Sequence, residues 1–308
     1  MSRVLVIGSA GLDIKAQPEG PLQPHLNNRG KVRNSVGGVA RNIAENLARL
    51  DQRVRLLSVL GDDGPGLRVL RHTRAAGVRV RDIRIMPGGR TLTTLALLDE
   101  RGEPQIALMD YDIMSAVDGD YLHEHEAEFA RADIIVIDAT LSEEALAVLF
   151  ELAERYNVRV CADPTTPALA RKLCPFLDRL FLVTPNAGET TALCGMEDPA
   201  RDRESALEAA RRLVSMGVQL AVVTLGDQGV AYADSRRAGY IRAVKIAVLD
   251  PTGAGDAFSG AVIFGLLNEV EIDEAMRLGM TAASLTLQSP ETVVPSLSQE
   301  LLYDKLVV

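Results

Sequence analysis

The 308-residue sequence is poor in the residues that mark several large classes of protein. It has no tryptophan and only three cysteines, Cys161, Cys174 and Cys194, an odd number without CxxC spacing. Such a set favours neither a disulfide framework nor a zinc site, so free thiols are expected. No apolar run reaches the roughly 18 residues of a membrane-spanning helix, and no signal-peptide pattern follows Met1. We therefore expect a cytoplasmic protein that does not enter a membrane.

Positive charge is in short supply as well. The 33 lysines and arginines are outnumbered by 42 aspartates and glutamates, which gives a formal net charge of -9. Because the sequence has no basic run of the kind that grips nucleic acid, a nucleic-acid partner is not expected. Any phosphate group must then be held locally, by backbone amides and a metal ion.

The two familiar phosphate-binding loops of nucleotide enzymes are absent. The spacing Gly8-x-x-Gly11 is not the GxGxxG of dinucleotide-binding proteins, and Gly30-Lys31 is followed by Val32 rather than by serine or threonine. Both familiar nucleotide-binding loops are therefore excluded.

The sequence does have a regular alternation of apolar strands and helical segments. Hydrophobic residues make up 47% of the chain, and its length suits one large α/β domain over residues 1–308. Because helical patterns separate the apolar runs, we predict a mostly parallel sheet. The predicted strands include residues 3–8, 53–61, 78–85, 133–138, 158–163, 180–184 and 220–226.

Two segments do not fit this alternation. Residues 15–36 are rich in proline, glycine and asparagine, and residues 88–112 contain two β runs around a turn at 99–103, which is typical of a hairpin. We expect the two segments to form a small separate sheet, a lid that covers a site. Its exposed edges would suit pairing with a second copy, so we also expect a homodimer through the lid.

The stretch Leu249 to Gly260, LDPTGAGDAFSG, joins a strand end, a glycine-rich bend and the start of an apolar helix. Gly253 and Gly255 let successive N–H groups point into one concavity, which binds anions. Asp256 beside it repels phosphate but is placed to take a proton from an attacking hydroxyl. The pairing indicates phosphoryl transfer, although a carboxylate that only caps a helix gives the same pattern.

Two groups of residues near the amino end are candidates for binding hydroxyl groups. Asp13 follows the first strand, at the sheet edge where ligands of α/β proteins bind; alternatively, it caps its own turn. Gly37-Gly38 precedes a helix whose first turn holds Asn42, an amide suited to vicinal hydroxyls. The alternative is a helix with a glycine-rich entry and no ligand.

Two later turns are candidates for the nucleotide side of a site. Asn186 and Glu189 lie three residues apart at a helix start, a spacing that suits either hydrated Mg²⁺ held through water or a simple helix cap. The turn from Gly226 to Gly229 follows an apolar strand and offers backbone that a nucleotide can approach closely.

Together, DPTGAGDAFSG, SVGGVARNIAENLA and TPNAGE resemble the signatures of the ribokinase-like carbohydrate kinases, the PfkB family. The motifs occur in the family's order and at its separations, between about residue 3 and residue 297. The resemblance implies an αβα sandwich with a mostly parallel central sheet and a small β-sheet lid. It also implies an ATP-dependent kinase that uses Mg²⁺.

The same resemblance implies a role for each matching residue. Asp256 would be the general base, and the backbone amides of Gly253, Ala254 and Gly255 would form the anion hole. The residues that would hold a ribose-like ring are Asp13, Gly37, Gly38 and Asn42. The residues that would bind the nucleotide and organise Mg²⁺ are Asn186, Glu189, Thr224, Gly226 and Gly229.

A monovalent cation such as K⁺ commonly binds beside the anion hole in this family, which places it near Asp250 and Thr252. Between them, Pro251 stands where family members commonly have threonine. Because proline has no N–H, a contact that needs that group cannot form here. The base Asp256 is unaffected by this difference.

Within the family, the helix after Gly38, the hairpin and the tail SPETVVPSLS are most similar to kinases that phosphorylate the 5'-hydroxyl of a C-glycosidic nucleoside. The base of that nucleoside would lie near the lid, where Thr93, Thr94 and Asp110 offer polar groups. Two other functions stay open. One is a kinase for ribose or another sugar or nucleoside, and the other is a non-catalytic nucleoside or sugar sensor.

Overall fold

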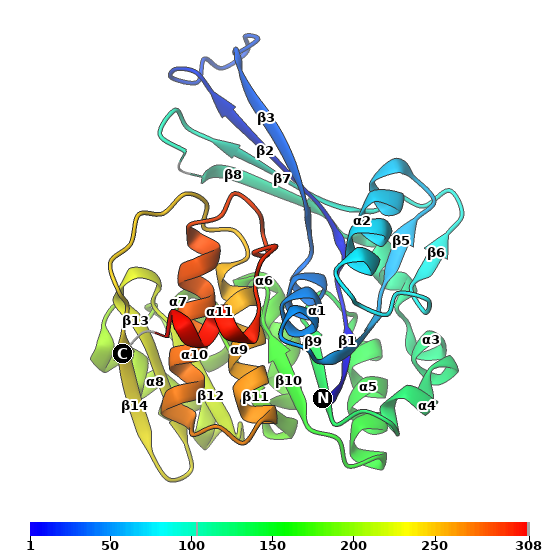
Figure 1. The fold of residues 1–308 in the computed structure, drawn as a ribbon, viewed down its shortest axis with the longest axis vertical. Helices are drawn as coiled ribbons and strands as arrows, with labels where there is room; N and C mark the ends of the chain where they lie inside the picture. The colour runs from blue at the N-terminus through cyan, green and yellow to red at the C-terminus, as the bar shows by residue number, and fades with distance from the viewer. Residues whose placement is uncertain (103, 307–308) are drawn as a thin grey trace.

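The computed structural model describes residues 1–102 and 104–306 and has three β-sheets with helices packed around the largest (Figure 1). Glu103, in the predicted hairpin turn at 99–103, lies outside the described residues, as do residues 307 and 308. Among the described residues, no helix is long and apolar enough to cross a membrane.

The main sheet has eight strands in the order β14-β13-β12-β11-β10-β9-β1-β4. Neighbouring strands are parallel except at the β14 edge, where β12 pairs with β13 and β13 pairs with β14 in the antiparallel direction. The strands are β1 (Arg3–Ile7), β4 (Arg53–Leu57), β9 (Ile134–Asp138), β10 (Val160–Asp163), β11 (Leu180–Val183), β12 (Leu220–Thr224), β13 (Gly229–Asp234) and β14 (Ala238–Arg242).

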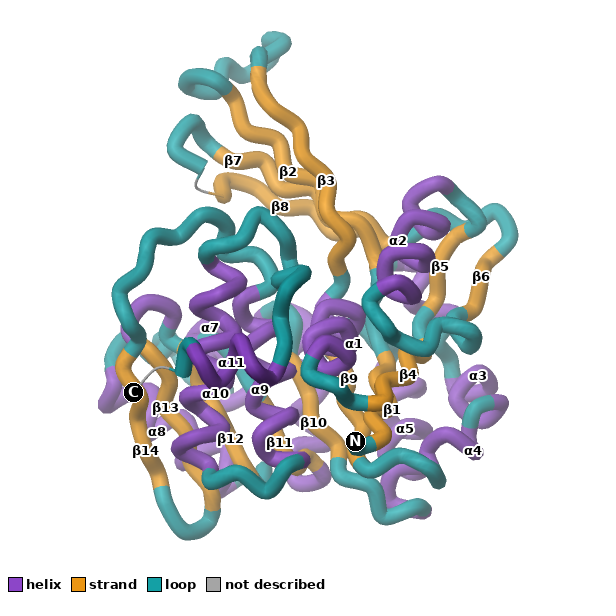
Figure 2. Tube along the Cα trace, in the orientation of Figure 1, coloured by secondary structure: helices purple, strands orange, loops and turns teal. Residues whose placement is uncertain are grey.

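Helices cover both faces of this sheet, as Figure 2 shows in purple against orange strands. They are α1 (Val39–Arg49), α2 (Gly64–Ala75), α3 (Gly119–Glu124), α4 (Glu126–Phe129), α5 (Glu143–Arg155), α6 (Pro167–Ala170), α7 (Ala187–Cys194), α8 (Arg203–Ser215), α9 (Ala254–Leu267), α10 (Ile272–Leu287) and α11 (Gln299–Asp304). Three 3₁₀ helices complete the set: η1 (Asp112–Ala116), η2 (Arg171–Arg179) and η3 (Gly226–Gln228).

The continuous apolar sequence of the central strands follows from this layering. In β1, Val4 and Val6 belong to the core formed with α1, α9 and α10, whereas Leu5 and Ile7 belong to the core formed with α5 and α8. Side chains of a strand alternate between faces, so a strand covered on both sides must be apolar at every position. The predicted α/β architecture with a mostly parallel sheet is confirmed.

A second sheet of four strands projects from the main body (Figures 1 and 2). Its strands lie in the order β3-β2-β7-β8, and we call it the small sheet: β2 (Gly11–Pro18), β3 (Gly30–Gly37), β7 (Leu92–Leu98) and β8 (Pro104–Asp110). These strands come from the two segments that the sequence set apart.

The small sheet has one polar and one apolar face. On one side, Asp13 lies opposite Thr94 in the register, and Lys15 follows two residues later. On the other side, Ile14 lies opposite Leu95, which in turn lies opposite Leu108. Several apolar side chains of this second face are exposed: Val32, Leu95, Ile106 and Leu108.

The segment from Arg53 to Met86 departs from the sequence prediction. A single strand was expected over 53–61, but the chain leaves the main sheet after Leu57. Val59–Gly61 then forms β5, which pairs with β6 (Arg84–Met86) in a separate two-stranded sheet. The prediction of a strand at 78–85 was therefore wrong for most of that range. Val78, Val80 and Ile83 are buried, but they belong to a connection rich in turns and not to a strand.

Candidate active site

The candidate base lies at the start of α9, next to the carboxyl ends of the parallel strands. Gly253 is the residue before the helix, with φ of 82°, and a Cβ there would lie 2.0 Å from the Thr292 carbonyl oxygen. Only glycine fits such a position. A Cβ on Gly255 would meet no described atom within 4 Å, so protein packing leaves open space beside this residue. That space suits the close approach of a ligand to the backbone.

Asp256 lies in the first turn of α9 and is 9% exposed. Burial raises the pKa of its carboxyl to about 7, although a hydrogen bond from Asn42 works in the opposite direction. A carboxyl with a pKa near neutrality suits a general base, because it exchanges protons readily at physiological pH.

Asn42 connects this base to α1. Its Nδ2 donates a 2.6 Å hydrogen bond to Asp256 Oδ2, and its Oδ1 accepts from the guanidinium of Arg41. The amide is therefore fixed in one orientation, with its donor end toward the base. Two predicted residues from distant parts of the sequence are in contact here.

Glycines allow the part of the small sheet around Asp13 to lie close to the start of α1. A Cβ on Gly37 would lie 2.2 Å from Asp13 Oδ2, and Gly38 has φ of 93° with no room for a Cβ beside Ala10. Burial raises the pKa of Asp13, while the charges of Lys15 and Arg41 oppose the shift. The glycine pair thus lets a buried carboxylate approach the backbone at the helix entrance.

Asp138 is a central residue of the site that the sequence did not single out. It lies at the end of β9, is completely buried, and accepts hydrogen bonds from Ser9 N at 2.8 Å and Ala40 N at 3.1 Å. It also accepts from the hydroxyls of Ser9 and Thr140 and from Thr140 N. One carboxylate therefore connects the end of β1 to the amino end of α1, where its negative charge interacts favourably with the helix dipole.

Arg41 and Glu45 form a buried ion pair on α1. Arg41 is fully buried, and its guanidinium donates to Glu45, to the carbonyl oxygens of Gly37 and Val36, and to Asn42. Burial works to raise the pKa of Glu45, but the hydrogen bond from His72 and the charge of Arg41 outweigh it and bring the pKa to about 2. This pair anchors both the glycine turn and Asn42.

Asn186 and Glu189 begin α7 and cap it reciprocally. Asn186 Oδ1 accepts from Glu189 N at 2.9 Å, and Glu189 Oε2 accepts from Asn186 N at 2.9 Å. The capping alternative is therefore confirmed. Nearby, Asp163 ends β10, and burial together with the charges of Glu189 and Asp256 holds its pKa well above the usual range.

These oxygen donors fit a hydrated Mg²⁺. Carboxylates that raise one another's pKa are stabilised by a divalent cation, and Mg²⁺ prefers to keep several waters. Among residues 1–102 and 104–306, no group of three His, Cys, Asp or Glu side chains is arranged to bind a metal directly. A hydrated metal ion would therefore be held here through its waters by Asn186 and Glu189, with Asp163 as a further carboxylate.

The predicted nucleotide residues lie beside this group. Thr224 pairs with Asn186 in an isolated parallel bridge, and its N–H donates to the Pro185 carbonyl oxygen at 2.9 Å. Gly226 has φ of 58° and open space at its Cβ position. At Gly229, a Cβ would lie 2.1 Å from the Ile241 carbonyl oxygen, so packing against β14 already requires glycine there.

Asp250 and Thr252, the residues predicted for a monovalent cation, contact a lysine. Lys15 Nζ lies 2.6 Å from both carboxylate oxygens of Asp250 and also donates to Thr252 Oγ1. Within the turn, Thr252 N donates to Asp250 Oδ1 at 2.9 Å, so the missing N–H of Pro251 leaves this turn intact.

Of the three residues predicted to lie near the nucleoside base, Thr94 lies on the same face of the small sheet as Asp13, whereas Thr93 and Asp110 lie on the opposite face. Thr94 shares the polar face of the small sheet with Asp13, and the two side chains are hydrogen-bonded. Asp110 lies opposite Thr93, on the other face, where it forms an ion pair with Arg90. Paired residues of neighbouring strands share a face, and successive residues do not. Thr94 and Asp110 therefore cannot contact one base together.

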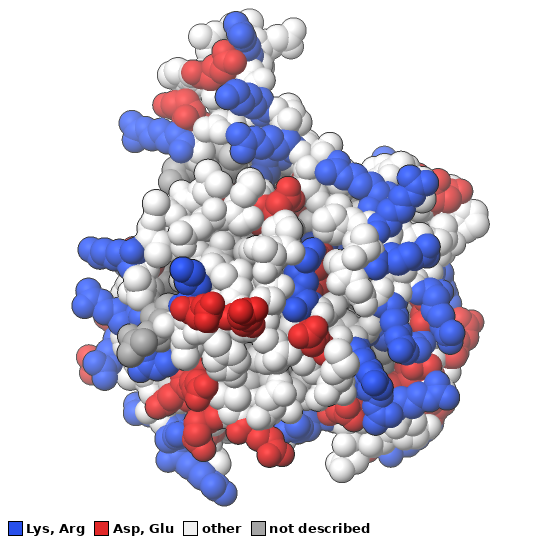
Figure 3. Space-filling model, viewed as in Figure 1, with Lys and Arg blue, Asp and Glu red and all other residues white. Residues whose placement is uncertain are grey.

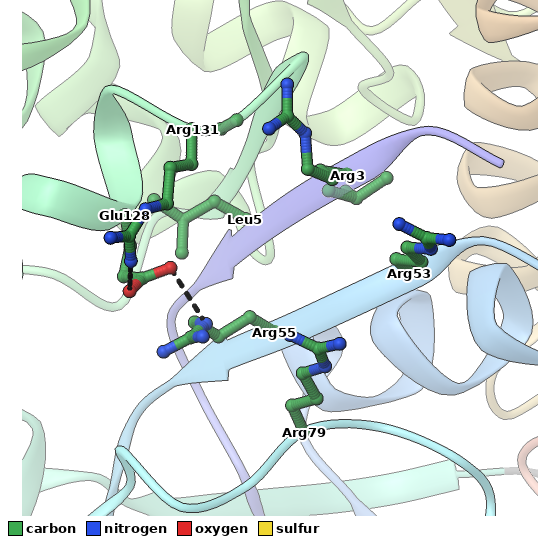
Figure 4. Close-up of a pocket in the computed structure, with 9 residues that line it drawn as sticks. Arg3, Leu5, Arg53, Arg55, Arg79, Glu128 and Arg131 are labelled. Atoms are coloured by element: carbon green, nitrogen blue, oxygen red, sulfur yellow. Dashed lines mark hydrogen bonds and ion pairs between the residues drawn. The ribbon is translucent and has the colours of Figure 1, made fainter.

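Two cavities lie at different edges of the main sheet. A cavity of about 470 Å³ lies between the small sheet and the loops around Asp250 and Glu291, with Lys15 in its wall. Another, of about 160 Å³, lies at the opposite edge of the main sheet and is ringed by arginines (Figure 4). There Arg55 and Arg131 both pair with Glu128, and Arg3 pairs with Asp133.

On the face of Figure 3, positive and negative side chains are interspersed. The carboxyl-end edge is therefore the candidate active site.

Comparison with known proteins agrees with this geometry. The sequence pattern of the pfkB family carbohydrate kinases matches residues 1–299. The chain belongs to this family. It is 34% identical to the pseudouridine kinase of Escherichia coli strain K12 over 96% of this chain and 93% of that protein. It is 29% identical to the guanosine-inosine kinase of Exiguobacterium acetylicum, over 96% and 98% of the two chains.

Solved structures of pfkB-like kinases have the same fold. A carbohydrate kinase from Agrobacterium tumefaciens aligns with a TM-score of 0.83 and 29% identity, over 99% of this chain and 97% of that one. Arabidopsis thaliana ribokinase, complexed with ribose and ATP, aligns with a TM-score of 0.87 at 22% identity, over 100% and 99%. The family and these relatives support a sugar or nucleoside kinase that uses ATP with Mg²⁺.

Proposed function

We propose that this protein transfers the γ-phosphoryl group of ATP to the 5'-hydroxyl of pseudouridine, with Asp256 as the general base. The observation that carries the chemistry is the buried Asp256 carboxyl at the amino end of α9, hydrogen-bonded to Asn42. The choice of nucleoside is supported by the 34% identity to a pseudouridine kinase over almost the whole chain.

In this proposal the chain's own residues orient the nucleoside and remove one proton. Asp13, Asn42 and the Gly37-Gly38 turn hold the ribose hydroxyls, which places the 5'-hydroxyl at the Asp256 carboxylate. Asp256 accepts the hydroxyl proton as the oxygen attacks phosphorus. The transferred group carries negative charge on its oxygens, and the backbone amides of Gly253, Ala254 and Gly255 point toward that charge.

The nucleotide side of the site is proposed from the residues around α7. Asn186 and Glu189 organise the waters of Mg²⁺, with Asp163 behind them, and Mg²⁺ supplies neutralisation of the phosphate charge when bound. Thr224, Gly226 and Gly229 line the nucleotide. The Ala254 N–H makes only a long 3.4 Å contact to the Pro251 carbonyl oxygen, which a phosphate oxygen can readily replace.

The substrate assignment is tested with a panel of pseudouridine, uridine, inosine, adenosine and ribose. We expect ADP release with MgATP to show the highest kcat/KM for pseudouridine and a product phosphorylated at the 5' position. A clear preference for ribose or a purine nucleoside would overturn the choice of substrate but keep the kinase. No ADP release with any acceptor would favour the sensor.

The role of Asp256 is tested by Asp256→Asn beside Asp120→Asn, an exposed control on α3. Loss of a general base costs about 10² to 10⁴ in rate. We expect that loss for Asp256→Asn with a retained fold, and an unchanged rate for the control. A fully active Asp256→Asn protein would refute the assignment.

We also propose that a second copy of the chain covers the apolar face of the small sheet. Val32 is 71% exposed, Ile106 57% and Leu108 65%, and edge strands with exposed apolar side chains favour self-association. Asp110 shares this face and pairs with Arg90, and the apolar side chains beside it can pack against their counterparts in a second copy. Light scattering should give a dimer, and Ile106→Glu with Leu108→Glu should give a folded monomer. A wild-type monomer at micromolar concentration would contradict the proposal.

A further inference from the structure

Lys15 is the charged side chain of the small sheet that contacts the loop before α9. An ammonium group has three N–H donors, and Lys15 has three acceptors within 2.6 Å: both oxygens of Asp250 and the hydroxyl of Thr252. The Lys15 and Asp250 side chains are 18% and 24% exposed, so the pair is largely withdrawn from water. The geometry is that of a fully satisfied cation site.

A monovalent metal ion does not fit at the same place. It would need the Asp250 carboxylate and the Thr252 hydroxyl as ligands, and Lys15 uses both. It would also lie next to the lysine ammonium, and two cations in contact repel strongly where water is partly excluded. Lys15 Nζ lies 2.6 Å from both oxygens of Asp250, so the lysine already supplies the positive charge at this carboxylate. The carboxylate is thus already neutralised.

The position of Lys15 gives this pair a second effect. Lys15 lies on β2, two residues after Asp13 and on the same face, whereas Asp250 and Thr252 immediately precede Gly253. The contact therefore joins the small sheet to the loop whose amides form the proposed anion hole. Through Thr252 N and the Asp250 side chain, it sets the conformation from which α9 begins.

We infer that the Lys15 ammonium is the resident cation of the loop 250–255, in place of a K⁺ ion, so that this protein needs no monovalent metal ion. The inference rests on the proposed phosphoryl transfer at the same loop. Lys15 acts as a positioning residue, because it orders the loop that contacts the phosphate and is not assigned a contact with substrate.

The first test needs no turnover. Thermal unfolding of the wild-type protein is compared in 100 mM KCl and in 100 mM tetramethylammonium chloride, about equal in ionic strength. A cation that binds the folded state would raise Tm with its concentration. We expect the same Tm in both salts. A rise in KCl of more than about 2 °C would overturn the inference.

The second test uses Lys15→Met, which keeps most of the side-chain length, beside Lys31→Met, an exposed lysine on β3 of the same sheet. The wild-type rate should be equal in the two salts. Because the loop acts on charge in the transition state, Lys15→Met should lower kcat by at least about tenfold and change the KM for ATP by less than about threefold. The control should retain the wild-type kcat.

The two tests separate this inference from the proposed substrate. The kinetic test uses whichever acceptor the substrate panel identifies. If pseudouridine is not phosphorylated but another acceptor is, the test of Lys15 can still be carried out. Stimulation of the wild-type protein by KCl, or a Lys15→Met variant with unchanged kcat, would overturn the role of Lys15 without affecting Asp256. An equal wild-type Tm in KCl and in tetramethylammonium chloride supports the inference even where no acceptor is phosphorylated.

Discussion

Asn42 Nδ2 donates a 2.6 Å hydrogen bond to Asp256 Oδ2, and this contact opposes the rise in pKa that burial imposes on the base. A hydrogen bond to a carboxylate favours its charged form. The amide of Asn42 therefore has an effect on protonation that is separate from any contact with substrate.

We predict that Asn42→Leu shifts the acid limb of the kcat/KM profile upward. In the wild-type protein kcat/KM should rise with pH and level off above about 7, because Asp256 must be deprotonated to act. Loss of a hydrogen bond to a charged group should move the midpoint up by about one unit. Asn268→Ala, at the far end of α9, should leave it unchanged. An unmoved limb in Asn42→Leu would show that the contact does not tune the base.

Stability should depend on pH through the same carboxyl. Its pKa is raised from 3.8 to about 7 on folding, so the folded protein binds more protons than the unfolded chain between these values. The free energy of unfolding should therefore fall as pH rises from about 4 to 7, by on the order of 4 kcal/mol for this group alone. Urea unfolding at pH 4 and pH 8 measures the change. Asp256→Asn should show a smaller difference than wild type, and an equal difference would contradict the assignment.

The buried pair of Arg41 and Glu45 should separate stability from activity. Arg41→Met leaves Glu45 buried with less compensation and should cost about 3 to 5 kcal/mol. The double variant Arg41→Met with Glu45→Met should regain most of that loss. Its kcat/KM should stay low, because Asn42 Oδ1 no longer has its donor. A stable and fully active double variant would show that Arg41 has no positioning role.

Asp138 should be essential for the entrance of α1. Asp138→Asn replaces one accepting oxygen by a donor, which leaves either both Ser9 N and Ala40 N, the partners of Oδ2, or Thr140 N, the partner of Oδ1, without an acceptor, at a cost of about 1 to 3 kcal/mol for each buried group. We expect a lower Tm and a higher KM for the acceptor. Asp133→Asn, on the exposed start of β9, removes a carboxylate of the same type and should change little. A comparable loss in both would count against the special role of Asp138.

Much of the site was predictable because its residues stand next to the glycines that shape it. Gly253, Gly37 and Gly38 mark backbone positions where no Cβ fits, and Asp256 and Asn42 lie within a few residues of them. Strands such as β9 and β10 were predictable because both of their faces are buried and their sequences are accordingly apolar up to the aspartate that ends each of them.

The remaining residues depend on contacts between distant segments. The helical periodicity of α1 does not predict that Arg41 is buried, because it does not show that β3 and the loop at Thr292 cover that side of the helix. Asp138 was one acidic strand end among several, and its partners lie 129 and 98 residues away. Whether Asp110 and Thr94 share a face was decided by strand register, which the hairpin sequence alone did not specify.

The position of Asp138 also determines where the two sheets can move relative to each other. The chain passes from the main sheet to the small sheet through Ser9 and returns through Gly37 to Ala40, and Asp138 holds both Ser9 and Ala40. A rigid clamp at the two crossings removes them as hinges. Any movement of β2 and β3 relative to the main sheet would then occur beyond Gly11 and before Gly37, whereas β7 and β8 join the small sheet to the body through other segments of the chain.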